Sequence, residues 1–181
     1  MKQLSDQALM QALCEGNSQA LTELHHRFAR PLHYFFCRGL EQSPALAEDL
    51  VQDLFVRLFQ KCEQFDPKRN FRAWTYSIAH NMLKNEYAKM EVRQRYSAES
   101  KAQQESFYDE RSSYEQIQLS EQIYAALEGE ELLKREAFIL RFREDLKIKE
   151  IAEGLDLPEG TVKSGLHYSI KKIQSKLGTN E

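Results

Sequence analysis

The chain has 181 residues, which is enough for one or two small domains with a buried core. Its formal net charge is only −3, so contact with nucleic acid has to depend on local basic patches. No apolar run approaches the roughly 18–20 residues that span a bilayer, and the first residues lack the apolar segment of a signal peptide, so we expect a cytoplasmic protein without membrane insertion.

Periodicity and capping signals predict three helices in the first third of the chain. Ser5 can cap a helix that runs to about Glu15. A second helix is expected over about residues 18–39, where Pro31 predicts a kink or a break. Ser43 and Pro44 begin the third, because a capping residue is followed there by proline in the first turn.

The third predicted helix has an apolar face and a charged outer face. We assign to the core its apolar positions Leu50, Val51, Leu54, Phe55, Leu58, Phe59 and Cys62. The outer face carries Glu48, Asp49, Gln52, Asp53, Arg57 and Gln60. Asp49 and Asp53 are one turn apart, and like charges at this spacing cost an isolated helix roughly 0.2–0.5 kcal/mol. This face is either a docking site for a basic protein partner or a solvated surface on which Arg57 offsets the repulsion.

A longer helical pattern follows the turn at Asp66-Pro67, with a core stripe of Phe71, Trp74, Ile78 and Met82. The other faces carry cations, amides and rings, at Arg72, Tyr76, His80, Asn81, Lys84, Asn85, Tyr87, Lys89, Arg93 and Arg95. Cations bind phosphates, amides reach base edges and rings stack on unpaired bases. The pattern therefore indicates contact with single-stranded or opened DNA, and a merely solvated helix is the alternative.

Residues 96–116 lose this periodicity and are rich in Ser, Gln and carboxylates. Such a composition is typical of a flexible linker, and its acidity should keep it away from DNA. The expected fold class is therefore all-α, with two small helical domains at residues 1–95 and 117–181. We expect the two domains to fold independently and to move relative to each other when no partner is bound.

The second domain should contain helices over about residues 117–129 and 131–143, followed by a helix-turn-helix. A short amphipathic helix carries Ile148, Ile151, Ala152 and Leu155, and the stripe of a longer one is Val162, Leu166, Ile170, Ile173 and Leu177. Asp156 falls where the turn needs a left-handed residue. Pro158 and Glu159 suit the first turn of the longer helix. An ordinary helical hairpin is the alternative.

Neither a metal site, a cofactor site nor an active site is predicted. Cys14, Cys37 and Cys62 form no CxxC pair, and His33 with Cys37 supplies only two ligands. The sequence has no glycine-rich phosphate loop and no Ser/His/Asp or Cys/His set at a useful spacing. We therefore expect a protein that is not an enzyme.

Together the two halves resemble a bacterial sigma factor of the extracytoplasmic-function (ECF) branch of the sigma-70 family. In that family, helical regions two and four are joined by a flexible linker. Residues 47–61 (AEDLVQDLFVRLFQK) resemble its core-polymerase-binding helix, and residues 65–89 resemble its promoter-opening segment. Residues 148–177 resemble the helix-turn-helix of region four. The resemblance runs in order over nearly the whole chain.

This resemblance implies binding to core RNA polymerase and to promoter DNA. Region two is expected to dock on the β′ clamp helices through Asp49, Gln52, Asp53 and Arg57, and region four on the β flap. At the minus-ten element the implied residues are Asn70, Arg72, Asn81, Lys84, Asn85, Lys89, Arg93 and Arg95, and the Phe65–Asn70 loop would hold an extruded base. At the minus-thirty-five element they are Thr161, Lys163, Ser164, His167 and Lys171. An anti-sigma factor is a candidate further partner.

One residue departs from the family pattern. Gly165 stands where the recognition helix usually has an arginine. A glycine within a helix costs about 1 kcal/mol relative to alanine. Since the replacement would also remove a phosphate or guanine contact, we expect weak or unusual recognition of the minus-thirty-five element.

The alternative function is a helix-turn-helix regulator that binds an operator without being a polymerase subunit. In such a protein the N-terminal helices would control the DNA-binding unit. This interpretation predicts dimerisation, and it leaves the like charges of Asp49 and Asp53 unexplained.

Overall fold

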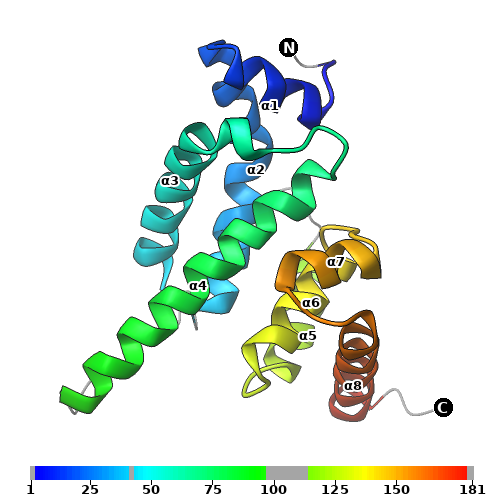
Figure 1. The fold of residues 1–181 in the computed structure, drawn as a ribbon. Helices are drawn as coiled ribbons and strands as arrows, with labels where there is room; N and C mark the ends of the chain where they lie inside the picture. The colour runs from blue at the N-terminus through cyan, green and yellow to red at the C-terminus, as the bar shows by residue number, and fades with distance from the viewer. Residues whose placement is uncertain (1–2, 41–42, 97–113, 179–181) are drawn as a thin grey trace.

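The computed structural model describes residues 3–40, 43–96 and 114–178, without the side chains of residues 93–96 and 114–117. Within these ranges the regular structure is entirely helical, which confirms the all-α class. The N-terminal helices are α1 (Asp6–Cys14), α2 (Ser18–Gly39), α3 (Pro44–Gln60), the short 3₁₀ helix η1 (Cys62–Gln64) and α4 (Phe71–Tyr96) (Figure 1). The C-terminal helices are α5 (Tyr114–Ala126), α6 (Leu132–Phe142), α7 (Ile148–Leu155) and α8 (Glu159–Leu177). No helix in the described ranges has the length and apolar character needed to cross a bilayer.

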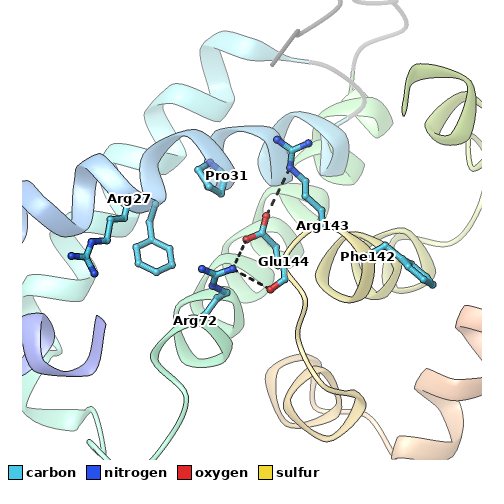
Figure 2. A pocket seen from close by; sticks show the side chains of 7 residues that line it. Arg27, Pro31, Arg72, Phe142, Arg143 and Glu144 are labelled. Carbon is cyan, nitrogen blue, oxygen red and sulfur yellow. Dashed lines mark hydrogen bonds and ion pairs between the residues drawn. The ribbon is translucent and has the colours of Figure 1, made fainter. Parts of the chain in front are cut away.

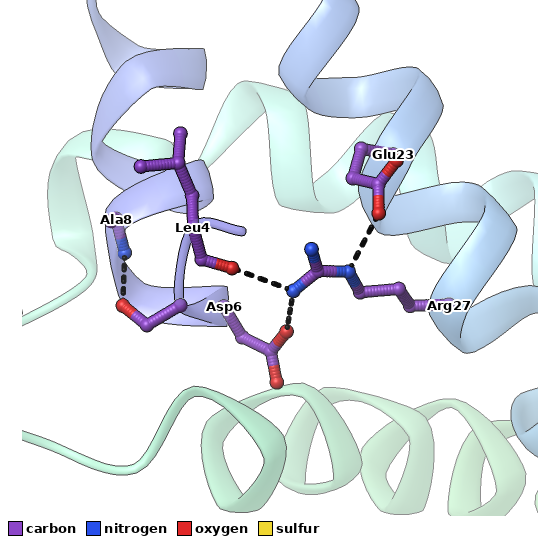
Figure 3. A network of polar contacts seen from close by, with 6 residues as sticks. Leu4, Asp6, Ala8, Glu23 and Arg27 are labelled. Atoms are coloured by element: carbon purple, nitrogen blue, oxygen red, sulfur yellow. Dashed lines mark hydrogen bonds and ion pairs between the residues drawn. The ribbon is translucent and has the colours of Figure 1, made fainter. Parts of the chain in front are cut away.

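The start of α1 is fixed to the middle of α2 by polar contacts. Ser5 Oγ accepts a hydrogen bond from Ala8 N at 3.2 Å, which caps α1 as predicted. Arg27 of α2 donates from Nη1 to Leu4 O and to Asp6 Oδ1, both at 2.9 Å (Figure 3). The helix α2 runs through Pro31 without ending there, so the break considered from the sequence is absent.

The apolar sides of α1–α4 meet in one core. From α3, Leu50, Leu54 and Leu58 are buried as predicted. Phe59 is 54% exposed, so its assignment to the core was wrong. At the end of α2 the backbone of Gly39 approaches α4 so closely that a Cβ there would lie 2.5 Å from Leu83 Cδ1. Only glycine allows this contact without a shift of Leu83.

The C-terminal helices contain the predicted helix-turn-helix, formed by α7 and α8. Asp156 ends α7 with φ 54° and ψ 50°, the left-handed conformation that the turn requires. Val162 and Leu166 of α8 are buried, whereas Ile170, which we had placed on the same stripe, is 38% exposed. The helix α5 begins at Tyr114, inside the segment that we assigned to the linker. Residues 97–113 lie outside the described residues, so the flexibility of the linker stays a prediction.

The two groups of helices pack against each other, and the expectation that they fold independently and move without a partner stays a prediction. Figure 1 shows α7 beside the N-terminal half of α4, and these helices contact one another, as do α2 and α6. The boundary includes rings: Tyr34 of α2 lies edge-on to Tyr124 of α5, with centroids 5.4 Å apart. It also includes polar pairs in which carboxylates of the C-terminal helices face donors of the N-terminal helices.

Candidate functional site

The exposed side of α3 combines charged and apolar side chains. Asp49, Gln52, Asp53 and Arg57 are all exposed, as the sequence predicted. Val56 and Phe59 lie among them and are 53% and 54% exposed. We call the six residues the α3 surface. Large apolar side chains at the centre of a polar face are typical of a protein-binding surface.

Sequence reasoning missed the apolar part of the α3 surface. Phe59 was assigned to the core with the other apolar residues of this helix, and Val56 was assigned to neither face. The helical repeat contains the signal that would have found both: Asp49, Gln52, Val56 and Phe59 follow one another three or four residues apart.

The outer side of α4 carries a second candidate surface. Asn81, Lys84, Asn85 and Lys89 are exposed and recur three or four residues apart, so they form one stripe, which we call the α4 stripe. Asn81 Nδ2 donates to Ser77 O at 2.9 Å, and Lys89 Nζ lies 2.5 Å from Glu86 Oε1. Arg93 and Arg95 belong to the last turns of α4, and their side chains lie outside the described residues.

Two other predicted DNA contacts, Asn70 and Arg72, are engaged within the chain. Asn70 Oδ1 caps α4 by accepting a hydrogen bond from Ala73 N at 3.2 Å, and Asn70 Nδ2 donates to Glu150 Oε1 at 2.8 Å. Arg72 Nη1 donates to Glu144 O at 3.1 Å and lies 3.7 Å from Glu144 Oε2 (Figure 2). These residues therefore differ from the α4 stripe, because their donors face carboxylates of the C-terminal helices.

The site around Glu144 is partly open. A cavity of about 460 Å³ is bordered by Phe28, Pro31, Arg72 and Arg143, with Glu144 between the two arginines (Figure 2). The guanidinium of Arg143 lies over the ring of Tyr34, 3.8 Å from its centroid. Burial raises the pKa of Glu144, and Tyr76 and the two arginines oppose the rise.

Tyr76 and His80 do not face solvent, although the sequence suggested rings available for base stacking. Tyr76 is fully buried, and burial raises the pKa of its hydroxyl well above the ordinary value. His80 is 4% exposed, and its Nδ1 lies 2.8 Å from Glu136 Oε2 on α6. Burial raises the pKa of Glu136, and the neighbouring His80 opposes that rise. Both rings therefore belong to the packing of the chain.

A second cavity, of about 350 Å³, lies between the start of α4 and the helix α7. Arg69, Trp74 and Ser77 line one side, and Glu150 and Gly154 line the other. Arg69 Nη2 lies 3.4 Å from Glu153 Oε2. The ring of Trp74 packs on Phe65, with centroids 5.1 Å apart. The loop that should hold an extruded base therefore borders a cavity that α7 lines on the other side.

The helix α8 presents the third candidate surface. All five predicted contacts, Thr161, Lys163, Ser164, His167 and Lys171, are exposed. Tyr168, which was not predicted as a contact, is 64% exposed and lies beside them in sequence. A basic, polar helix face of this kind can enter the major groove of duplex DNA.

Gly165 lies on the opposite side of α8. It is buried, and a Cβ at this position would lie 3.7 Å from Lys134 Cγ of α6. A Cβ there would be directed toward α6, which argues against a DNA contact from this position. The expectation that Gly165 marks a lost DNA contact is not tested by this packing and stays a prediction.

The only metal ligands that the sequence suggested as a pair, His33 and Cys37, lie together on α2. Cys37 Sγ lies 3.7 Å from His33 Nδ1, inside α2. In the described part of the chain, no group of three or more His, Cys, Asp or Glu side chains is arranged to hold a metal ion.

Comparison with known proteins identifies the family. The model of Sigma-70 region 2 matches residues 25–93, and the model of Sigma-70, region 4 matches residues 120–173. The chain belongs to the sigma-70 family. The first match covers α3 and most of α4, and the second covers the helix-turn-helix, so the surfaces described above lie in regions two and four.

Similar proteins extend the match to nearly the whole chain. The ECF RNA polymerase sigma-E factor of Haemophilus influenzae is 26% identical over 186 residues, covering 97% of each chain. The ECF RNA polymerase sigma-E factor of Escherichia coli K12 is 27% identical over 185 residues, covering 97% of this chain and 96% of the relative. The protein is therefore an RNA polymerase sigma factor of the ECF type, and the operator-binding regulator is set aside.

Solved structures share the fold. CnrH in complex with the cytosolic domain of CnrY aligns with a TM-score of 0.69 at 22% identity, covering 97% of this chain and 99% of that chain. The sigma factor RpoE of Bartonella quintana, in complex with the anti-sigma factor NepR, aligns with a TM-score of 0.67 at 24% identity, covering 88% and 97%.

Proposed function

We propose that this sigma factor binds core RNA polymerase through the α3 surface and directs it to promoters with the α4 stripe, the start of α4 and the exposed side of α8. It would act in the cytoplasm as a subunit without catalytic activity of its own. Residues 1–95 would form region two and residues 117–181 would form region four, with residues 96–116 as a flexible linker between them.

The observation that carries this proposal is the composition of the α3 surface. Asp49 and Asp53 are exposed one helical turn apart and repel each other, while Val56 and Phe59 expose apolar surface to water at a cost in free energy. A partner with basic and apolar groups that covers the helix would reduce the repulsion between the aspartates and remove the apolar side chains from water. The β′ clamp helices of core polymerase are the partner that the family implies.

The DNA contacts would be divided between the two elements of the promoter. The amides of Asn81 and Asn85 would read bases of the opened minus-ten element, while Lys84 and Lys89 hold its backbone. Thr161, Lys163, Ser164, His167 and Lys171 would contact the minus-thirty-five element in the major groove. Region four would also dock on the β flap.

An anti-sigma factor is proposed as a regulatory partner. The Bartonella quintana relative of this fold was solved with its anti-sigma factor NepR, and CnrH was solved with CnrY. The exposed apolar residues of α3 offer such a protein a surface that polymerase would otherwise cover.

Gel filtration of the purified chain with core RNA polymerase tests the central part of this proposal. We expect the chain to co-elute with core, and a peptide copy of the β′ clamp helices to compete with it. Failure to co-elute at micromolar concentrations would contradict the proposal. A regulator that acts without polymerase would instead elute as a dimer.

A further inference from the structure

Region four meets region two through its carboxylates. Glu121, Glu136, Glu144, Glu150 and Glu153 lie within ion-pair or hydrogen-bond distance of Arg38, His80, Arg72, Asn70 and Arg69 respectively. Each acid comes from α5–α7 or the loop before α7, and each donor comes from α2, α4 or the loop before α4. The interface is therefore complementary in charge along its length.

Three of these pairs fall on the surface that should hold the minus-ten element. The carboxylates of Glu150 and Glu153 face Asn70 and Arg69, and Glu144 faces Arg72. The same donors would otherwise face phosphate and base oxygens of DNA. A carboxylate and a phosphate oxygen are both anionic hydrogen-bond acceptors, so they compete for one set of donors.

The backbone contact between the two helices leaves little room for a nucleotide. A Cβ built on Gly154 of α7 would lie 3.4 Å from Ala73 O of α4, and no other described atom outside the adjoining residues lies within 4 Å of it. A side chain at residue 154 therefore points toward region two, and one larger than a methyl group would meet α4. The cavity of about 350 Å³ beside it is lined by α7 on one side.

We propose that α7 and the loop before it mask one part of the minus-ten surface of the free sigma factor, the loop before α4 and the start of α4, with Glu150, Glu153 and Glu144 in the positions that DNA oxygens take when region four moves away. The inference rests on the proposed function, since it assigns the start of α4 to promoter DNA. The α3 surface stays exposed in the docked arrangement, and so do the α4 stripe and the contacts on α8. Core polymerase can therefore bind first, and separation of the regions then uncovers the loop and the start of α4.

This arrangement has a quantitative consequence. When only the undocked form binds the minus-ten strand, the apparent affinity equals the intrinsic affinity multiplied by the undocked fraction. A variant that undocks α7 therefore binds single-stranded DNA more tightly, by a factor equal to the ratio of the undocked fractions. A variant that leaves docking intact shows no gain.

The chain's only tryptophan reports on docking without a label. Trp74 lines the cavity between α4 and α7, so acrylamide should quench its fluorescence more strongly once α7 leaves. Gly154→Leu should undock α7, because the side chain extends toward Ala73. Gly154→Ala is the matched control, since 3.4 Å is an ordinary van der Waals contact for its Cβ.

A second variant undocks α7 through charge instead of bulk. It is a double variant, Glu150→Gln with Glu153→Lys. Glutamine at residue 150 can still accept the hydrogen bond from Lys147 N at the start of α7, and lysine at residue 153 places a cation against Arg69. The matched control is Glu15→Gln with Glu128→Lys, which makes the same change of formal charge at exposed positions outside α7. Circular dichroism at the working temperature confirms that each variant is folded.

The experiment measures acrylamide quenching and the Kd for a short fluorescein-labelled single strand of mixed sequence at low salt. We expect both undocked variants to show stronger quenching and at least about fivefold tighter binding, with both controls like the wild type. Stronger quenching with unchanged affinity would overturn the masking role of α7. Unchanged quenching in both variants would overturn it as well, because the contact would not hold the regions together.

The outcome separates this inference from the proposed function. Transcription by core polymerase with the wild-type chain tests the sigma role alone, and it does not depend on whether the free chain is masked. Active transcription together with unchanged strand affinity in the undocked variants would contradict masking and leave the sigma role standing. Failure of wild-type transcription would contradict the proposed function itself.

Discussion

His80 Nδ1 lies 2.8 Å from Glu136 Oε2, and this contact joins α4 of region two to α6 of region four. The two side chains are only 5% and 1% exposed, so the pair is shielded from water on all sides. A buried charged or hydrogen-bonded pair is costly to form, and losing one partner leaves the other unsatisfied. The contact therefore favours one particular packing of the two regions, and it makes that packing sensitive to protonation.

Docking of the regions should weaken as pH rises. Burial raises the pKa of Glu136 and Glu144 in the docked form, against opposing effects of His80, Arg72 and other nearby cations. A raised pKa means that the docked form holds its protons more tightly than the separated form. This contribution to docking is fully present below the ordinary carboxyl pKa and is lost as pH rises through the raised values.

The measurement is quenching of Trp74 by acrylamide in steps from about pH 5 to about pH 8, a range over which global unfolding is not expected. Quenching should increase with pH in the wild type, and Glu136→Gln should flatten the dependence because the side chain no longer titrates. A decrease of quenching with pH would contradict the assignment of these carboxyls to the docked interface.

Charge reversal on the α3 surface should abolish binding to core polymerase. Asp49→Lys combined with Asp53→Lys replaces two exposed carboxylates, so the helical content and the melting temperature should change little. Co-elution with core and circular dichroism give the two readouts. The control is Glu15→Lys with Glu128→Lys, which makes the same charge change at exposed positions outside α3. Unaltered affinity for core in the first variant would refute the docking assignment.

Two neighbouring residues of α3 should separate stability from partner binding. Leu58 is fully buried, so Leu58→Ala should lower the free energy of unfolding by about 2–5 kcal/mol. Phe59 is 54% exposed, so Phe59→Ala should change stability by no more than about 0.5 kcal/mol. Phe59→Ala should nevertheless weaken core binding. Denaturant unfolding measures the stability of both variants, and a titration with core polymerase measures their binding. A large loss of stability in Phe59→Ala would show that Phe59 belongs to the core.

Arginine should increase affinity for minus-thirty-five DNA at residue 167 and not at residue 165. His167 is exposed beside Ser164, whereas Gly165 faces Lys134 of α6. His167→Arg should steepen the salt dependence of duplex binding by about one unit if the new contact is to phosphate. Gly165→Arg should give no gain, although it restores helix propensity of about 1 kcal/mol. Binding at two salt concentrations checks both variants, and tighter binding by Gly165→Arg would contradict the orientation of α8.

The helices and their order could be predicted from local signals. Caps at Ser5, the proline at the start of α3 and the left-handed Asp156 each act within a few residues of the chain, so the sequence contains them in full. The exposed residues of the α4 stripe and of α8 were also predicted correctly as exposed, because helical periodicity separates them from the core.

The packing of region four on region two could not be predicted in this way. It depends on pairs such as Asn70 with Glu150, which are 80 residues apart and use polar side chains that a helical pattern assigns to solvent. Tyr76 and His80 were placed on an exposed face for the same reason. Phe59 shows the opposite error, since it was placed in the core with other apolar residues although it is 54% exposed. Residue type indicates burial only when the neighbouring surfaces are known.

The most direct test of the central claim is transcription in vitro with core RNA polymerase on a library of genomic fragments, with start sites read by sequencing. We expect new start sites that appear only when the sigma factor is added, share elements near minus ten and minus thirty-five, and disappear with Asp49→Lys and Asp53→Lys. An absence of added start sites, with the chain binding duplex DNA as a dimer in the absence of core, would contradict the account.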